Sequence, residues 1–142
     1  MTYIHSHFGV YALIFNEEKD KVLLIKKARG PYTGMFDLPG GSPEPTELLE
    51  ETLYREIKEE TDCDVTHAVQ IGGVSAKFHY RKNSGEEAIL RHLGVVYKTE
   101  IAGTPKVDAD GEDSNGCVWL NICDLNNKNA TPFVFEAIRK SA

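Results

Sequence analysis

The chain has 142 residues, of which 41% are hydrophobic and 27% charged, and its 22 acidic and 16 basic side chains give a formal net charge of −6 at pH 7. This length suits one domain with a full hydrophobic core, so we expect a single domain over residues 1–142. The negative charge repels polyanions, which argues against a stable complex with nucleic acid.

Membrane and secreted proteins are disfavoured as well. The uninterrupted apolar stretches, such as residues 10–15, are far shorter than a membrane span. The first residues have neither the basic start nor the apolar block of a secretory signal. Cys63, Cys117 and Cys123 form no CxxC pair, and an odd cysteine count suits a reducing compartment. We therefore expect a cytoplasmic protein without a membrane partner.

The first half of the chain predicts two strands, a long loop and a helix. Residues 8–16 and 21–27 are β-branched and aromatic runs joined by a polar turn, which predicts a hairpin. Residues 28–45 are rich in glycine and proline and predict a long structured loop with a short strand at 36–38. Thr46 is a suitable cap for a helix that ends near Thr61.

The second half predicts mostly strands. They are expected over residues 65–75, 76–81, 89–101 and 117–120, with a turn at 83–85 and a polar, turn-rich segment at 103–116. A terminal helix over 131–140 is expected to bury Phe133, Phe135 and Ile138. This order of elements predicts an α/β or α+β sandwich, with a mixed sheet flanked by helices.

The predicted helix at 46–61 carries charges on its apolar side. Leu49, Leu53 and Ile57 recur every fourth residue and form an apolar stripe. Glu56 and Glu60 fall inside this stripe, where two like charges about 6 Å apart repel by roughly 3 kcal/mol at an effective dielectric near 20. A divalent cation with oxygen ligands would relieve this repulsion. The alternative is that these glutamates are simply solvated, as in many glutamate-rich helices.

The spacing of residues 41–63 resembles the signature box of the Nudix hydrolase family, G-x5-E-x7-R-E-U-x-E-E-x-G-U, where U is bulky and aliphatic. Gly41, Glu47 and residues 55–61 match every charged position. Asp62 stands where the family usually has glycine, but Asp tolerates a left-handed backbone. Cys63 stands in place of an aliphatic residue and is itself a small hydrophobe. The resemblance implies the Nudix fold over the whole chain.

This resemblance implies a MutT-like enzyme and a set of metal ligands. The expected reaction is Mg2+-dependent hydrolysis, with Mn2+ as a possible substitute, of a diphosphate linkage in a nucleoside diphosphate derivative. A dNTP, a dinucleoside polyphosphate, ADP-ribose and a nucleotide sugar all qualify as substrates. The implied metal ligands are Glu56, Glu59, Glu60 and the carbonyl of Gly40. Arg55 is expected to orient the glutamates through a salt bridge.

The general base and the role of Glu47 are less constrained. Glu56 is the first choice for the base, and Glu112 or Asp113, in the polar segment before Trp119, is the alternative. On a regular helix Glu47 points away from Glu56 by about half a turn, so only a supporting role is expected for it.

The substrate-binding residues are predicted more weakly. Tyr80 follows the box at a spacing similar to that in diadenosine polyphosphate hydrolases, and Phe36 is placed to stack on a base. Arg29 leads into the long loop and is a candidate for phosphate contact. Each of these three residues also has an ordinary explanation, in a strand, in the core or at a solvated strand end.

Other functional classes remain open at this point. One is a nucleotide-sensing domain that kept the fold and lost turnover, and another is an acidic protein that buffers metal ions. An isoprenoid diphosphate isomerase shares the fold, but this chain is short and has no evident cysteine-based site. The intact set Glu56, Glu59 and Glu60 favours the enzyme, as a monomer or a homodimer.

Overall fold

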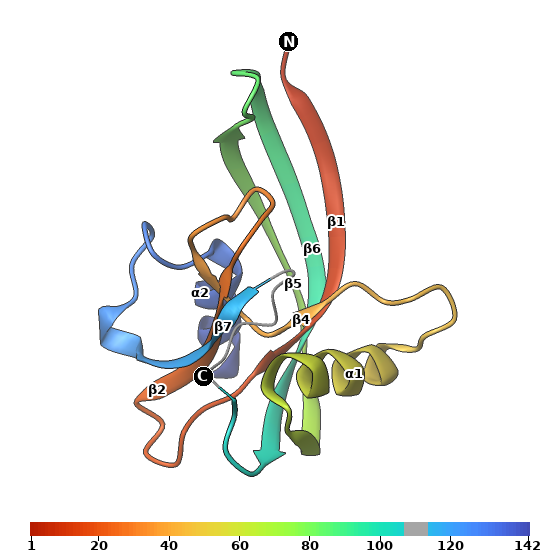
Figure 1. Cartoon of the computed structure of the whole chain (residues 1–142), viewed down its shortest axis with the longest axis vertical. Helices are drawn as coiled ribbons and strands as arrows, with labels where there is room; N and C mark the ends of the chain where they lie inside the picture. The colour runs from red at the N-terminus through yellow and green to blue at the C-terminus, as the bar shows by residue number, and fades with distance from the viewer. Residues whose placement is uncertain (107–113) are drawn as a thin grey trace.

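The computed structural model describes residues 1–106 and 114–142 (Figure 1). The predicted residues Glu112 and Asp113 lie outside this part of the chain. The elements in chain order are β1 (Tyr3–Leu13), β2 (Lys21–Lys27), β3 (Phe36–Asp37), β4 (Gly40–Gly41), α1 (Leu49–Thr61), β5 (Asp64–Arg81), β6 (Glu87–Ala102), β7 (Ser114–Asn121), the single 3-10 turn η1 (Ile122–Asp124) and α2 (Pro132–Ser141).

The strands form two sheets. The larger has the order β4-β1-β6-β5, with β1 parallel to β6 and the other neighbours antiparallel. The smaller is antiparallel, with the order β3-β2-β7. In Figure 1 the N-terminal half of β1 and the β5–β6 hairpin rise beyond the body of the molecule as a three-stranded arm. The predicted mixed sheet flanked by helices, an α+β fold, is confirmed.

The core consists of two apolar clusters on opposite sides of β1. Residues 10 and 12 of β1 and Ile14, directly after it, pack with Leu53 and Ile57 of α1, so the predicted apolar stripe of this helix is confirmed. Tyr11 and Leu13 pack with Phe133 of α2. Each fully buried Leu, Ile or Phe contributes roughly 1.5–3 kcal/mol. The two helices are therefore fixed on opposite faces of the larger sheet.

The first two strands differ from the predicted hairpin. Backbone N–H groups of Asn16 and Leu23 donate to the carbonyls of Lys21 and Ile14, so pairing occurs next to the turn. Beyond it, β1 and β2 separate into different sheets. β1 also begins at Tyr3 rather than at residue 8, because β6 pairs with it along its whole length.

The expected strands over 65–75 and 76–81 are one continuous strand, β5. Its irregularities are register shifts at Val65/His67 and Gln70/Gly72. A bulge bends a strand without ending it, so the glycines at 72 and 73 do not interrupt the pairing with β6. The last helix, α2, is confirmed within one residue, with Phe133 fully buried and Phe135 partly buried. Within the described chain, no helix is long and apolar enough to cross a membrane.

The helix α1 starts and ends differently from the simplest expectation. Its N-cap is Leu48 rather than Thr46, and Oε1 of Glu51 accepts the Leu48 N–H at 2.8 Å. An acidic side chain therefore caps the helix where a hydroxyl was expected. Asp62 ends the helix in the left-handed conformation at φ 62°, and Cys63 after it is buried. Both departures from the usual box thus fit the backbone.

Candidate functional site

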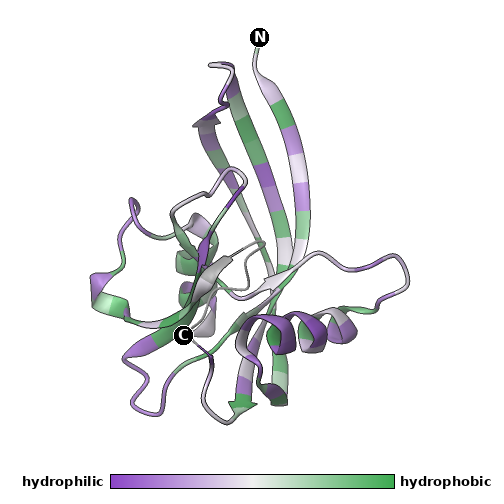
Figure 2. Ribbon diagram, viewed as in Figure 1, coloured by the Kyte–Doolittle hydropathy of each residue, from purple (hydrophilic) through white to green (hydrophobic). Residues whose placement is uncertain are grey.

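A cleft of about 460 Å³ lies where β1, β4 and the N-terminal half of α1 meet. Gly40 and Gly41 of β4 line it, together with Arg55 and Glu56 of α1. The apolar stripe of α1 is buried against β1, and this packing turns the neighbouring polar positions of the helix toward the cleft. Figure 2 shows hydrophilic residues along the outward side of the same helix.

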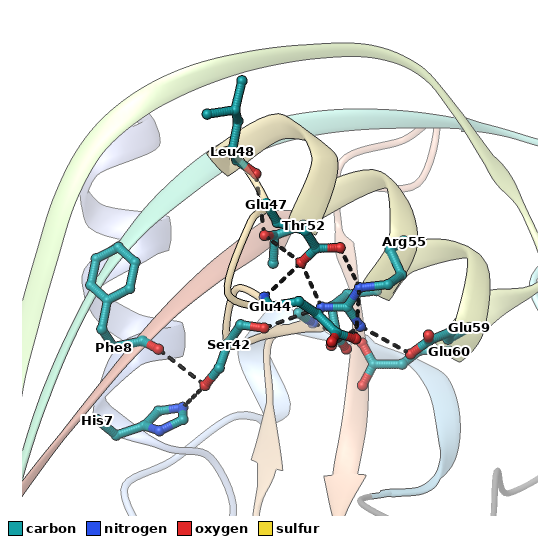
Figure 3. Close-up of polar contacts among 12 residues, drawn as sticks. His7, Phe8, Ser42, Glu44, Glu47, Leu48, Thr52, Arg55, Glu59 and Glu60 are labelled. Carbon is teal, nitrogen blue, oxygen red and sulfur yellow. Dashed lines mark hydrogen bonds and ion pairs between the residues drawn. The ribbon is translucent and has the colours of Figure 1, made fainter.

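Arg55 organises the acidic side chains at this cleft (Figure 3). Its Nε and Nη2 donate to the two carboxylate oxygens of Glu47 at 2.6 and 2.9 Å. Its Nη1 lies 2.8 Å from Oε1 of Glu56 and 3.4 Å from Oε2 of Glu59. Nη2 also donates to the carbonyl of Ser42 at 3.1 Å. One guanidinium thus holds three glutamates and a loop, as its planar fork of donors allows.

The expectation that Glu47 points away from the site was wrong for a simple geometric reason. It assumed that Glu47 lies on the helix, but α1 begins only at Leu49. The turn at Pro45 and Thr46, closed by a hydrogen bond from the Glu47 N–H to the Glu44 carbonyl, brings the carboxylate back against Arg55. Hydrogen bonds from Arg55, and then from the backbone N–H of Glu44, lower the pKa of Glu47 to about 2. Glu47 therefore stays ionised at any physiological pH.

Two glycines bring the backbone of β4 against the acids of α1. Oε1 of Glu60 accepts the N–H of Gly40 at 2.7 Å, and Glu60 is only 6% exposed. Gly40 has φ 146°, and a Cβ there would overlap the backbone of Val10 and Tyr11. A Cβ on Gly41 would lie 2.8 Å from the carboxylate carbon of Glu56. The backbone therefore excludes a side chain at position 40, whereas a side chain at position 41 would displace the Glu56 carboxylate.

The donor set around the cleft fits a hard divalent cation. All the candidate side-chain donors are carboxylate oxygens, which Mg2+ and Mn2+ prefer. Glu56 and Glu60 are one helical turn apart, and their side chains are mostly buried, at 16% and 6% exposure. Glu59 is more open, at 57%. Within residues 1–106 and 114–142, no three acidic, His or Cys side chains are already gathered closely enough to hold an ion, so an ion bound here would have to draw the glutamates together.

The fit of Gly41 against Glu56 predicts a specific defect in ion binding. Gly41 does not need a left-handed backbone, so Gly41→Ala adds only a methyl group against the Glu56 carboxylate. We expect Mn2+ affinity, measured by isothermal titration calorimetry, to fall about tenfold or more. Gly73→Ala is the matched control, because its Cβ meets only an ordinary contact at 3.7 Å. Equal Mn2+ affinity in both variants contradicts the expectation.

The three predicted substrate-binding residues are scattered. Phe36 of β3 is partly buried, packs against the Phe133 cluster and lies 5.9 Å from the Lys26 ammonium. Arg29 is exposed in the loop between β2 and β3. Tyr80 lies in the arm and shares a hydrogen bond of 2.7 Å with His5. Their roles stay predictions.

Tyr80 lies far from the cleft along the sheet. It pairs with Ala88 of β6, which in turn pairs with Tyr3, whereas Val10 pairs with Gly41 of the cleft. Tyr3 and Val10 are seven residues apart along β1, which is about 23 Å at a strand rise of ~3.3 Å. Tyr80 and the acidic cluster are therefore not brought together.

The cleft also contains polar residues to which the sequence assigned no role. His7, Tyr11, Asp37 and Ser42 all line it, and so does Lys27, which leads into the long loop with Arg29 and is, like it, a candidate for phosphate contact from the sequence. No local pattern identifies them, because they converge from β1, β2, β3 and the segment after β4. The one signal in the sequence is that Asp37 is the acid in an otherwise apolar and glycine-rich run, residues 36–41.

Behind the cleft, a buried histidine fixes the position of one wall. His92 is 1% exposed, and its Nε2 and Nδ1 lie 2.7 and 3.0 Å from the hydroxyls of Tyr11 and Tyr32. Burial, and then the charges of His7 and Lys27, lower the pKa of His92 to about 3. The neutral imidazole thus links β1 to the loop between β2 and β3.

Asp37 is expected to make the stability of the folded protein depend on pH. Burial raises its pKa from 3.8 to about 6, although hydrogen bonds from Thr131 and Leu38 and the charge of Lys27 oppose the shift. The folded state binds the proton of Asp37 more tightly than the unfolded state does. Protonation of Asp37 therefore stabilises the fold below pH 3.8, and this stabilisation is lost as the pH rises through 6. As the pH rises from about 3.5 to 7, the free energy of unfolding of Asp37→Asn, measured in urea, should increase by ~3 kcal/mol relative to that of the unmodified protein. A difference in unfolding free energy between the two proteins that does not change with pH contradicts this prediction.

The comparisons with known proteins agree on one family. A family model described as "NUDIX domain" matches residues 5–140. The chain is 31% identical over 113 residues to a putative 8-oxo-dGTP diphosphatase of Bacillus subtilis, covering 80% of this chain and 65% of that protein. It is 48% identical over 59 residues to an ADP-ribose pyrophosphatase of Methanocaldococcus jannaschii, covering 42% and 34%. The chain thus spans less than two thirds of either relative.

Solved structures show the same fold. A MutT NUDIX hydrolase from Burkholderia pseudomallei superposes with a TM-score of 0.68 at 24% identity, over 97% of this chain and 99% of the other. The NUDIX domain of Shewanella oneidensis NrtR, in complex with ADP ribose, superposes with a TM-score of 0.58 at 20% identity, over 97% and 90%. At these identities the likeness concerns the fold alone.

Proposed function

Because the chain belongs to the NUDIX domain family, we propose that it hydrolyses a diphosphate linkage in a nucleoside diphosphate derivative, with Mg2+ or Mn2+ as cofactor. The observation that carries the proposal is the arrangement around Arg55. Its guanidinium holds Glu47, Glu56 and Glu59 at the cleft, while Glu60 is anchored on the backbone of Gly40. A domain that only binds nucleotides has no need for all of these acids on one guanidinium.

The acids of α1 and the backbone of β4 would hold the divalent ion, which would neutralise the diphosphate oxygens and lower the pKa of bound water. Arg55 keeps the carboxylates separated and oriented toward the ion site until they bind the ion. Glu56 lines the cleft and is the candidate general base that accepts the proton of the attacking water. Glu60, held by Gly40, fixes the distance between helix and loop.

The substrate is best identified with a panel of nucleotides. The relatives named above are an ADP-ribose pyrophosphatase and a putative 8-oxo-dGTP diphosphatase, so ADP-ribose and 8-oxo-dGTP are the first two candidates. They are incubated alongside dNTPs, diadenosine polyphosphates and nucleotide sugars, with Mg2+ or with Mn2+, and the products are separated. Hydrolysis above the metal-free blank supports the proposal. Nucleotide binding without hydrolysis of any member favours the nucleotide-sensing alternative.

A further inference from the structure

The side chain of Asp37 is buried and locked in orientation at the inner end of the cleft. Asp37 ends β3 and is 3% exposed. Its Oδ1 accepts the hydroxyl of Thr131 at 2.7 Å and the N–H of Leu38 at 2.8 Å. Thr131 is itself fully buried at the N-terminus of α2. The carboxylate therefore cannot rotate without breaking two hydrogen bonds.

The second oxygen of this carboxylate has no partner among the residues that the structure describes. Among the described residues every hydrogen bond to Asp37 goes to Oδ1, and no Lys, Arg or His lies within ion-pair distance of either oxygen. Lys27 lines the same cleft and is the charge that most lowers the pKa of Asp37, but it forms no ion pair with it. Every fully buried side-chain oxygen of the described residues has a hydrogen-bond partner, so the unpartnered Oδ2 is accessible from the cleft that Asp37 lines and is available to a donor on a ligand.

The chemistry of the cleft determines which part of a ligand can meet Asp37. A phosphate would be repelled by this carboxylate, and the phosphates already have a place beside the acids of α1 and their cation. The Asp37 end of the cleft suits an uncharged group with N–H or O–H donors. In a nucleotide such donors belong to the base and to the sugar.

We propose that Oδ2 of Asp37 accepts a hydrogen bond from the nucleoside part of the substrate and sets the specificity of the enzyme. This inference rests on the proposed function of the same cleft. Tyr11 forms a wall beside Asp37, held by its hydrogen bond to His92, so the position of the acceptor is fixed before a ligand arrives. A site built to pair with one donor rejects analogues that lack it far more strongly than an apolar pocket does.

Asp37→Asn tests the proposal with little change of shape. Because the donors from Thr131 and Leu38 still require an oxygen at the first position, the amide NH2 takes the place of Oδ2. An acceptor in the cleft becomes a donor. For the best substrate of the panel, kcat/KM should fall about tenfold to a hundredfold, mainly through KM. Asp124→Asn, in the exposed turn η1, is the matched control and should leave both constants unchanged.

Substrate analogues then separate the base from the sugar. Guanosine, inosine and adenosine forms of the best substrate differ in the donors of the base, whereas ribo and deoxyribo forms differ in one hydroxyl. The unmodified protein should discriminate within one of these two series, and Asp37→Asn should lose or invert that discrimination. Identical discrimination by both proteins overturns the inference.

A binding measurement keeps this outcome distinct from failure of the proposed function. GMP, IMP, AMP and dGMP are titrated into both proteins by calorimetry, without turnover. If no nucleotide is hydrolysed but the affinities still differ between the two proteins as described, only the proposed reaction fails. If hydrolysis occurs and neither kinetics nor affinity depends on Asp37, only the proposed role of Asp37 fails.

Discussion

Replacing Glu60 by glutamine is expected to lower turnover of the nucleotide substrate by about a hundredfold or more, while the protein stays folded. The glutamine oxygen can still accept the N–H of Gly40, which now lies 2.7 Å from Oε1 of Glu60, so the contact between helix and loop survives. The negative charge is lost. Steady-state kinetics with Mg2+ give the effect on turnover, and thermal unfolding shows whether the fold is intact.

A second glutamate on the same helix provides the control. Glu51 accepts the N–H of Leu48 through one carboxylate oxygen, so Glu51→Gln makes the same chemical change outside the cleft. Its turnover should match that of the unmodified protein. Unchanged turnover in Glu60→Gln would remove Glu60 from the metal ligands, whereas equal losses in both variants would point to a general effect of helix charge.

Arg55→Lys is expected to weaken Mn2+ binding and to lower kcat/KM, each by about ten- to a hundredfold. Lysine keeps the positive charge but is a point charge on a flexible stem. It cannot contact both oxygens of Glu47, the Glu56 carboxylate and the Ser42 carbonyl together, as Arg55 does. Without that fork, the glutamates move independently and an ion has to order them on binding.

Arg55→Lys needs two measurements, because weaker binding of the metal ion by itself also lowers kcat/KM. Mn2+ affinity comes from calorimetry, and kcat/KM is measured over a range of Mg2+ concentrations. Excess Mg2+ should restore part of the activity if Arg55 acts by positioning the ligands. The control is Arg139→Lys, which alters an exposed pair with Glu136 in α2. A variant of Arg55 with native Mn2+ affinity would contradict the positioning role.

The helix α1 shows what the sequence can predict and where local rules stop. Leu49, Leu53 and Ile57 define its buried face, because the 3.6-residue period needs no knowledge of the partner. The same period predicted the wrong direction for the Glu47 side chain, because Glu47 precedes the helix. The N-cap at Leu48 was missed for a related reason, since the Glu51 carboxylate rather than a hydroxyl accepts a backbone N–H at the start of the helix, that of the N-cap residue.

The remaining differences arise from contacts distant in sequence. The arm of β1 begins at Tyr3 only because β6, some 85 residues later, pairs with it in parallel. Asp37 is buried with Thr131, 94 residues away, as its partner. Neither pairing leaves a trace within a short window of sequence. The box, by contrast, is local, and both the loop and helix that carry it follow from its spacing.

The net charge of −6 is unevenly distributed. Residues 44–64 hold 9 acids and 2 bases, a balance of −7, which leaves 13 acids and 14 bases, or +1, for the rest of the chain. The acidity is therefore concentrated in α1 and the residues that flank it, and part of it lies where Arg55 gathers the glutamates beside the cleft. Once a cation is held there, the same region attracts phosphates, so the overall negative charge does not exclude an anionic substrate.

The close approach of Gly41 to Glu56 also limits how this site can evolve. Every other amino acid carries a Cβ, and at this position the Cβ would lie 2.8 Å from the carboxylate carbon. No single codon change that replaces the glycine avoids this overlap. A shorter acid in place of Glu56 would make room, but it would withdraw the carboxylate from Arg55. A side chain at position 41 therefore displaces the Glu56 carboxylate from Arg55 unless position 56 changes as well, so selection for ion binding acts on the two positions as a pair.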